Sequence, residues 1–317
     1  MNSIPVKRYI THNCVENCIA NLCDSYGIDF RPLFLFSWDI DLKTTDPIFE
    51  NNIHYHSEFD ISIDDFFDTY YDISKLYFNM SFILIINKIS DIMSLLIDGN
   101  IILIKSNAYY IPWNLAYQRY HVLHSFLITY DSIKKSINVV DSFSSNNTIE
   151  LENLENLNIE KSLLVKISRD SQNECTPTLL KSRYLPILKS NIKNKVYNSI
   201  ANFSNELEKI SSIAQLTANP DDLSNAILIR RLSNIANARY NTRCLFEYLQ
   251  WPNNFVEAMN DIYTKWESVK NMFIKIILSK RLKLIPQIRQ ELITLSNLEN
   301  DLCHAIIKDN TILGDQL

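Results

Sequence analysis

Residues 11–27 read THNCVENCIANLCDSYG, and this run predicts an amphipathic helix that begins at a cysteine. Its apolar residues recur at the spacing of one helical face: Cys18, Ile19, Leu22, Cys23 and Tyr26. Asn13 is a typical N-cap residue, and Glu16 stands three positions later, where it completes a capping box. This register makes Cys14 the first residue of the helix. The helix dipole and the unpaired amides at that position favour a thiolate, so Cys14 is a candidate nucleophile.

The rest of the first half predicts a mixture of short strands with one more helix. Strands are expected at 33–36, 54–59, 101–105, 124–130, 137–141 and 162–167. A helix is expected over 80–97, where Asp98-Gly99 supplies a stop signal. The segment 29–80 is otherwise aromatic-rich and irregular, so no further element is predicted within it.

After residue 175 the strand signals vanish, and helical patterns occupy 183–216, 221–249, 253–281 and 286–309. The breaks between them contain prolines, which interrupt helical hydrogen bonding: Asn219-Pro220, Trp251-Pro252 and Pro286. The sequence therefore predicts an α+β fold. A catalytic domain of mixed structure covers residues 1–172, and an all-α domain covers residues 173–317.

The composition excludes several classes of function. Three glycines among 317 residues cannot build a GxxxxGK[ST] phosphate loop or a GxGxxG dinucleotide turn. A net charge of −5 without a dense Lys/Arg run argues against nucleic acid binding. The most apolar stretch, 81–105, is interrupted by three charged residues, and the N-terminus has no apolar signal segment, so neither a membrane span nor secretion is expected. The six cysteines form no disulfide framework, which favours a cytoplasmic protein with reduced thiols.

A thiolate nucleophile needs a general base and a group that orients the base. His124 opens a predicted strand, and Asp141 ends the neighbouring strand of the same hairpin. Because pairing of these strands would bring the carboxylate to the imidazole, we predict a catalytic triad of Cys14, His124 and Asp141. His121, three residues earlier, is the alternative base. A nucleophile on a helix with its partners on a sheet is typical of a papain-like layout.

A metal site is the competing interpretation of the first helix. The segment contains four residues of types that zinc prefers: His12, Cys14, Cys18 and Cys23. Ligands at helical positions i, i+4 and i+9 cannot all converge on one ion, and no CxxC is present. His54 and His56 alternate on an expected strand without a third ligand at suitable spacing. No metal is therefore predicted.

Several short motifs, taken in their order and spacing, resemble papain-like bacterial enzymes. They are Cys14–Gly27, Gly99–Ile104, Tyr109–Trp113, His121–Asp131, Val140-Asp141, Arg239–Leu249 and Tyr263–Trp266. The first resembles the catalytic helix of the double-glycine leader peptidases of bacteriocin export. The whole set, which covers most of the chain, is similar to the butirosin biosynthesis protein H family of acyltransferases. Members of that family carry a strand, a Tyr-x-x-Pro-aromatic segment, the histidine strand and then a helical domain.

The resemblance implies a papain-like cysteine acyltransferase with Cys14, His124 and Asp141 in the catalytic roles. An acyl group would arrive as a thioester on the phosphopantetheine of an acyl carrier protein, pass to Cys14 and leave on a small amine as an amide, in antibiotic or other natural product biosynthesis. No further cofactor is implied. The chain departs from both families beside the nucleophile, because Arg8 replaces a glutamine of the peptidases and Asn13 replaces a histidine of the acyltransferases. The candidate oxyanion donors are the Cys14 backbone N–H and the Asn13 side chain.

Two other functions remain open on the same residues: a cysteine peptidase, and a non-catalytic binding module with a papain-like fold. The aromatic segment ahead of the histidine strand could wall a substrate pocket or pack below the sheet; its candidate pocket residues are Tyr109, Tyr110, Trp113 and His121. An acidic carrier protein would prefer a basic surface. The densest candidate is 280–283 with Arg289, which also fits a solvated helix end, and the alternatives are Arg230-Arg231 and Arg239 with Arg243.

Overall fold

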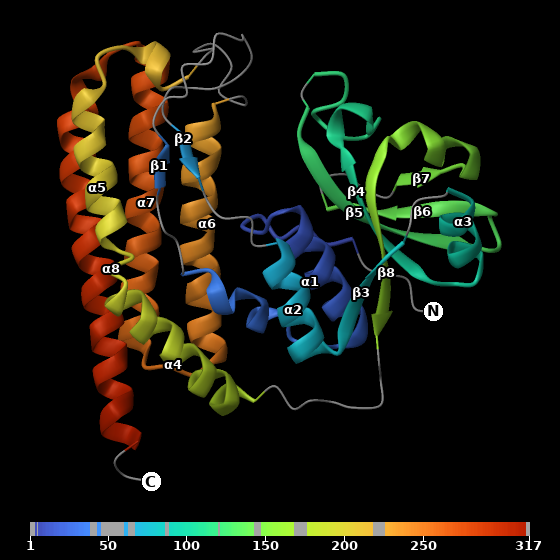
Figure 1. Ribbon diagram of the computed structural model, residues 1–317, viewed down its shortest axis with the longest axis horizontal. Coiled ribbons are helices and arrows are strands. Elements are labelled where there is room, and N and C mark those ends of the chain that lie inside the picture. Colours follow the sequence, from blue (N-terminus) through green and yellow to red (C-terminus); the bar gives the residue numbers. More distant parts are fainter. Residues whose placement is uncertain are drawn as a thin grey trace. The chain divides into compact units, whose positions relative to one another are not determined.

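The computed structural model of the chain (Figure 1) describes residues 4, 6–38, 43–45, 60–62, 67–85, 89–119, 121–142, 147–167, 176–217 and 226–314. The chain forms two compact units, one of Met1–Leu33 with Phe66–Cys175 and one of Phe34–Asp65 with Thr176–Leu317. The first combines a sheet with helices and the second is mainly helical, so the expected α+β class is confirmed. The expected domains, 1–172 and 173–317, are each continuous in the sequence. In the structure Phe34–Asp65 belongs to the second unit, so the first unit consists of two segments of the chain.

The first unit contains a six-stranded antiparallel sheet with the strand order β3-β8-β4-β5-β6-β7. In that order the strands are Met80–Leu84, Ile159–Ile167, Ile101–Asn107, Leu123–Asp131, Ser136–Val140 and Asn147–Ile149. Helices α1 (Cys14–Tyr26), α2 (Phe67–Phe78) and α3 (Ile89–Ile97) belong to the same unit, as do the 3-10 helices η2 (Ala108–Tyr110) and η3 (Leu151–Leu157). The chain passes from the first unit to the second within the 3-10 helix η1 (Arg31–Phe36).

Helix α1 begins at the predicted residue and has the predicted capping box. The Asn13 side chain accepts a hydrogen bond from the Glu16 N–H, and the Glu16 carboxylate accepts one from the Asn13 N–H at 2.8 Å. Gly27 ends the helix with a φ of 69°, a left-handed conformation that glycine adopts at little cost. Cys14 is therefore the first helical residue, as the capping box predicted.

One face of the sheet packs against α3 and η3 and forms the core of this unit. Alternate residues of β5 and β6 face it, together with Ile92 and Leu96 of α3. Because side chains alternate along a strand, the row that contains Phe126 and Ile128 continues to His124, and the row of Ile137 and Val139 continues to Asp141. The candidate base and its carboxylate thus lie on the same sheet face, at the edge of the apolar core.

Of the elements predicted in the first half of the chain, one is wrong and another is correct only in its second part. Residues 33–36 form part of η1 instead of a strand, because Pro32 lacks an N–H for a strand ladder and favours a helical turn. Residues 80–97 begin as β3, which pairs with β8 from Met80↔Ile167 onward, and only then form α3. A short apolar run is compatible with helix or strand, and the pairing with β8 decides between them. Helix α2 was not predicted, and the strand expected at 54–59 lies outside the described residues.

The second unit contains α4 (Pro177–Lys193), α5 (Asn198–Glu206), α6 (Ile227–Tyr248), α7 (Asn253–Ser279) and α8 (Ile285–Gly314), with the short strand pair β1 (Lys43–Thr45) and β2 (Asp60–Ser62). The helix expected over 183–216 is broken after α4, where Lys195 has a positive φ. The predicted break at Trp251-Pro252 is confirmed, and Asn219-Pro220 lies outside the described residues. None of the helices described is at once long and apolar enough to cross a bilayer.

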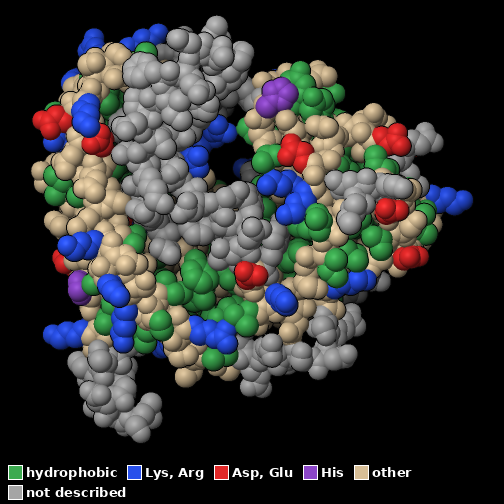
Figure 2. Space-filling model, in the orientation of Figure 1, with side chains coloured by type: hydrophobic (Ala, Val, Ile, Leu, Met, Phe, Trp, Pro, Cys, Tyr) green, Lys and Arg blue, Asp and Glu red, His purple; other side chains and the backbone are tan. Residues whose placement is uncertain are grey.

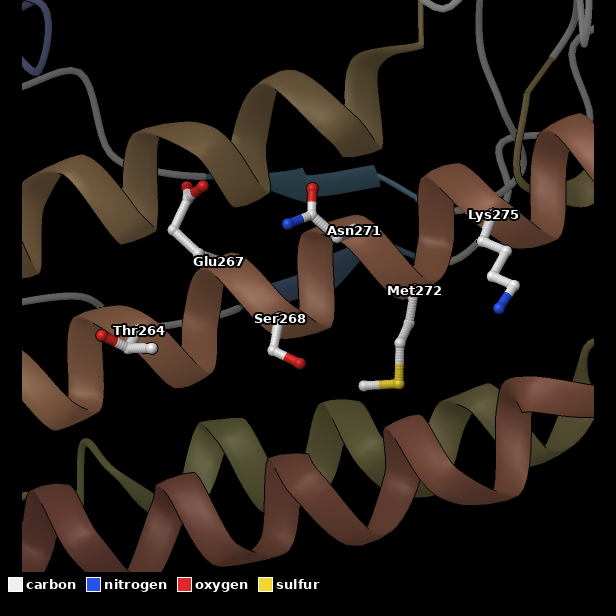
Figure 3. A pocket seen from close by; sticks show the side chains of 6 residues that line it. All are labelled: Thr264, Glu267, Ser268, Asn271, Met272 and Lys275. Atoms are coloured by element: carbon white, nitrogen blue, oxygen red, sulfur yellow. The ribbon is translucent and has the colours of Figure 1, made fainter.

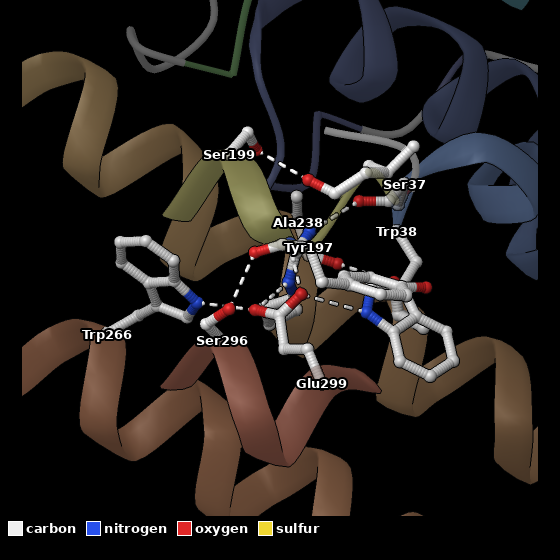
Figure 4. A network of polar contacts seen from close by, with 11 residues as sticks. Ser37, Trp38, Tyr197, Ser199, Ala238, Trp266, Ser296 and Glu299 are labelled. Atoms are coloured by element: carbon white, nitrogen blue, oxygen red, sulfur yellow. Dashed lines mark hydrogen bonds and ion pairs between the residues drawn. The ribbon is translucent and has the colours of Figure 1, made fainter. Parts of the chain in front are cut away.

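A buried ion pair joins the elements of the second unit (Figure 4). Glu299 of α8 accepts hydrogen bonds from Arg239 of α6 at 2.9 and 2.6 Å and from the indole N–H of Trp266 in α7 at 2.7 Å. The Trp38 indole donates to the same carboxylate at 3.1 Å, and Arg239 also donates to the Ser37 carbonyl. The buried Glu299 carboxylate therefore accepts four hydrogen bonds, which offset part of the cost of removing its charge from water.

Candidate active site

The candidate site begins where β6 ends. β6 pairs with β5 from Asp131↔Ser136 to Leu127↔Val140, so the edge of β5 before Leu127 extends beyond its neighbour. Asp141 follows directly and reaches diagonally toward His124 on the same face. His124 Nε2 donates to Asp141 Oδ2 at 2.8 Å, and both side chains are buried. The hairpin inferred from the sequence therefore places the imidazole and the carboxylate in contact.

Helix α1 supplies the thiol at this edge of β5, which does not pair with β6. Cys14 hydrogen-bonds to the His124 side chain and to the backbone and hydroxyl of Ser125. One turn later, the Cys18 thiol donates to the Ser125 carbonyl at 3.6 Å. Because Asp141 engages Nε2 of His124, Nδ1 is the ring nitrogen left for Cys14. The structure thus brings Cys14, His124 and Asp141 together in one chain of contacts.

The electrostatic interactions among Cys14, His124 and Asp141 favour a thiolate beside an imidazolium. Burial alone would raise the pKa of Cys14, but the hydrogen bond and charge of His124, with the hydrogen bonds from Ser125, bring that pKa below its usual value. Burial likewise disfavours a charged His124, yet the hydrogen bonds and negative charges of Asp141 and Cys14 raise its pKa. Opposite shifts of the two pKa values widen the pH range in which both groups are charged.

The other described thiols behave as core residues where a shift is resolved. Burial raises the pKa of Cys18 and Cys23 well above the ordinary value, and burial raises that of Cys303 to about 11. All cysteines of the described part are reduced, and Cys175 lies outside it. Of these shifts, only the one at Cys14 is toward the thiolate.

Trp113, a candidate pocket residue, contacts the Asp141 carboxylate. Its indole N–H donates to Asp141 Oδ2 at 2.9 Å, so one oxygen accepts from both Trp113 and His124. The indole ring packs edge-on against Phe126, with ring centroids 5.5 Å apart. Two donors on one oxygen hold the carboxylate in a single orientation and favour its ionised form.

The remaining expected pocket residues form an aromatic cluster at the same end of the sheet. The Tyr109 ring stacks on His121 at a centroid distance of 4.3 Å, and Tyr110 packs edge-on against Tyr109. The side-chain oxygen of Asn107 accepts a hydrogen bond from the Tyr109 N–H. The side-chain NH2 of Asn107 then donates to His121 Nδ1 at 3.1 Å. The structure therefore brings His124, and not the alternative base His121, to Asp141 and Cys14.

The candidate oxyanion donor Asn13 is engaged as the N-cap of α1 through its carbonyl oxygen. The backbone segment ahead of it is held along α1 by two further asparagines. Asn21 exchanges hydrogen bonds with the backbone of Lys7, and Asn17 accepts from the Tyr9 N–H and donates to the His12 carbonyl. The spacing of Asn13, Asn17 and Asn21 at i, i+4 and i+8 was a signal for this arrangement. Neither this arrangement nor the contact of Ser125 with Cys14 was predicted from the sequence.

The competing metal interpretation has no geometric counterpart in the described residues, where no three His, Cys, Asp or Glu side chains gather in a possible metal site. His12 is buried and stacks on Tyr9 with a centroid distance of 4.8 Å. Burial lowers the pKa of His12 to about 3. The expected strand histidines, His54 and His56, lie outside the described residues.

Two arginines of the expected basic surfaces interact within the helical unit. Arg239 is buried in the ion pair with Glu299, so it is not part of a docking surface. Arg289 is bound to the Ser204 carbonyl and to Glu208. A hollow of about 420 Å³ runs along one face of α7 between Thr264 and Lys275 (Figure 3), and its lining includes none of the predicted site residues.

Neither the protein-family models nor the curated proteins compared with the sequence include a match to it.

Proposed function

We propose that the chain is a cysteine-dependent acyltransferase that forms amides, with a papain-like catalytic unit. The contacts from Asp141 through His124 to Cys14 carry this proposal, because the resulting pKa shifts favour a thiolate nucleophile without a metal. The resemblance to the butirosin biosynthesis protein H family supports a thioester on an acyl carrier protein as the donor. It also supports a small amine as the acceptor and a cytoplasmic role in natural product biosynthesis.

The proposed reaction has two steps. The Cys14 thiolate attacks the thioester carbonyl, the carbon–sulfur bond of the donor breaks, and the departing thiolate takes the proton of the His124 imidazolium. The amine then attacks the acyl–Cys14 thioester, His124 accepts the amine proton, and the carbon–sulfur bond to Cys14 breaks. The products are the amide and the starting thiolate–imidazolium pair. Asp141 keeps the imidazole in one orientation and stabilises its charged form.

A cysteine peptidase would use the same three residues, and the two functions differ in whether an amine or water discharges the acyl-enzyme. We expect intact mass spectrometry to show an acyl adduct that persists for minutes in buffer and disappears quickly when a suitable amine is added. The Cys14→Ala variant should form no adduct, and Cys18→Ala should form it normally. Rapid hydrolysis without an amine, or cleavage of peptides at a defined residue, would instead assign the site to a peptidase.

A further inference from the structure

The loop that joins β4 to β5, described for residues 108–119 and 121–122, exposes several large apolar side chains. Tyr110 is 40% exposed, Tyr117 37% and Leu115 84%, and Leu123, the first residue of β5, is 50% exposed. In Figure 2 apolar side chains, with a histidine beside them, gather on the surface where this loop lies. Large apolar side chains concentrated on a surface loop are typical of a binding site.

The β4–β5 loop is held in one conformation beside the catalytic residues. The Ala108 N–H donates to the Val122 carbonyl at 2.8 Å and closes the base of the loop. The Gln118 N–H donates to the Tyr109 carbonyl at 3.0 Å and closes its centre. Trp113, which lies between these residues in the sequence, donates a hydrogen bond to Asp141. The exposed apolar groups are therefore part of a preformed surface, whose ordering costs little when a ligand binds.

The row of side chains that contains the exposed Leu123 leads toward the nucleophile along β5. Side chains on one face of a strand are two residues apart, or about 7 Å. Ser125, which hydrogen-bonds to Cys14, therefore shares a face with the exposed Leu123, and the same row leads to His121 and its stacked partner Tyr109. An acyl group bonded to the Cys14 sulfur begins within a few ångströms of this row.

The charge of the loop defines the kind of group that fits it. Residues 108–123 contain no Asp or Glu and one cation, Arg119. Resting on the acyl transfer proposed above, we propose that Leu123 and the β4–β5 loop bind the acyl group, and that this group is apolar and uncharged. Burial of each added methylene against such a surface favours the longer acyl chain.

The test is the rate at which N-acetylcysteamine thioesters acylate the protein, followed by intact mass spectrometry. The donors are hexanoyl, acetyl and succinyl thioesters, and each rate is divided by the iodoacetamide labelling rate of Cys14 in the same variant. We expect the hexanoyl donor to react about tenfold faster than the acetyl donor, and the succinyl donor to react more slowly than the hexanoyl donor.

Leu123→Ser and Tyr110→Ser should each reduce the hexanoyl-to-acetyl ratio at least about threefold. The matched control is Leu278→Ser, which removes a leucine that is 60% exposed on α7 and should leave the ratio unchanged. A wild-type ratio near one, equal rates for succinyl and hexanoyl donors, or loop variants that behave like the control would overturn the inference alone. Normal iodoacetamide labelling with no acylation by any thioester would overturn the proposed function itself, and this inference with it.

Discussion

Replacing Asp141 with asparagine should remove the negative charge beside the His124 imidazole while keeping the shape of the site. One carboxylate oxygen accepts from His124 at 2.8 Å and from Trp113 at 2.9 Å. A hydrogen bond to a charged group contributes about 1.5–3 kcal/mol. Since about 1.4 kcal/mol corresponds to one pKa unit, the loss of the charge should lower the pKa of His124 by about one to two units.

The change at His124 should carry over to Cys14, because the charged imidazole holds the pKa of that thiol down. The thiolate is present above the Cys14 pKa, and the imidazolium is present below the His124 pKa. In Asp141→Asn the first value rises and the second falls, so the pH range of the ion pair narrows from both sides. The acid inflection of iodoacetamide labelling should move to higher pH by about one unit.

We expect kcat of Asp141→Asn to fall by roughly 10²-fold while the circular dichroism spectrum and melting curve stay near those of the wild type. Labelling of the Cys14→Ala variant gives the background from other thiols. An unchanged inflection would show that Asp141 does not act on the ion pair, and full activity would reduce the site to a Cys–His dyad. Asp131 is a poor substitute acid, because it ends β5 at the far end from His124.

Three further predictions test single contacts. Trp113→Phe keeps the aromatic packing but removes one donor to Asp141, and kcat should fall about tenfold with little change in the melting temperature. Burial holds the pKa of His12 at about 3 in the folded state, below its value in the unfolded chain. Its contribution to the free energy of unfolding is therefore complete above pH 6.5 and is lost as the pH falls toward 3. Urea titrations at pH 7 and pH 5 should show a loss of about 2 kcal/mol, which His12→Phe should abolish. Glu299→Gln leaves Arg239 buried without its anion and should lower the free energy of unfolding by about 3–5 kcal/mol. The double variant Arg239→Met with Glu299→Gln should lower it by less than the sum of the two single changes, as measured by tryptophan fluorescence in urea.

Local signals in the sequence were sufficient to predict the elements that carry the candidate catalytic residues. Asn13 and Glu16 interact within one helical turn, so the start of α1 and the position of Cys14 could be predicted from their spacing. The hairpin of β5 and β6 is closed by a short turn, and its alternating pattern placed His124 near Asp141 before any long-range contact was known.

Tertiary contacts decided the features that depend on residues far apart in the chain. β3 is a strand because it pairs with β8, more than seventy residues away, although its own apolar run is equally compatible with a helix. Trp113 turns its N–H to Asp141, and Arg239 is buried against Glu299 instead of lying on a basic surface. Ser125 can contact Cys14 because the pairing of β6 with β5 ends at Leu127, before it reaches Ser125. A sequence pattern determines which face of an element is apolar, but only packing determines which distant side chain supplies the partner for a buried polar group.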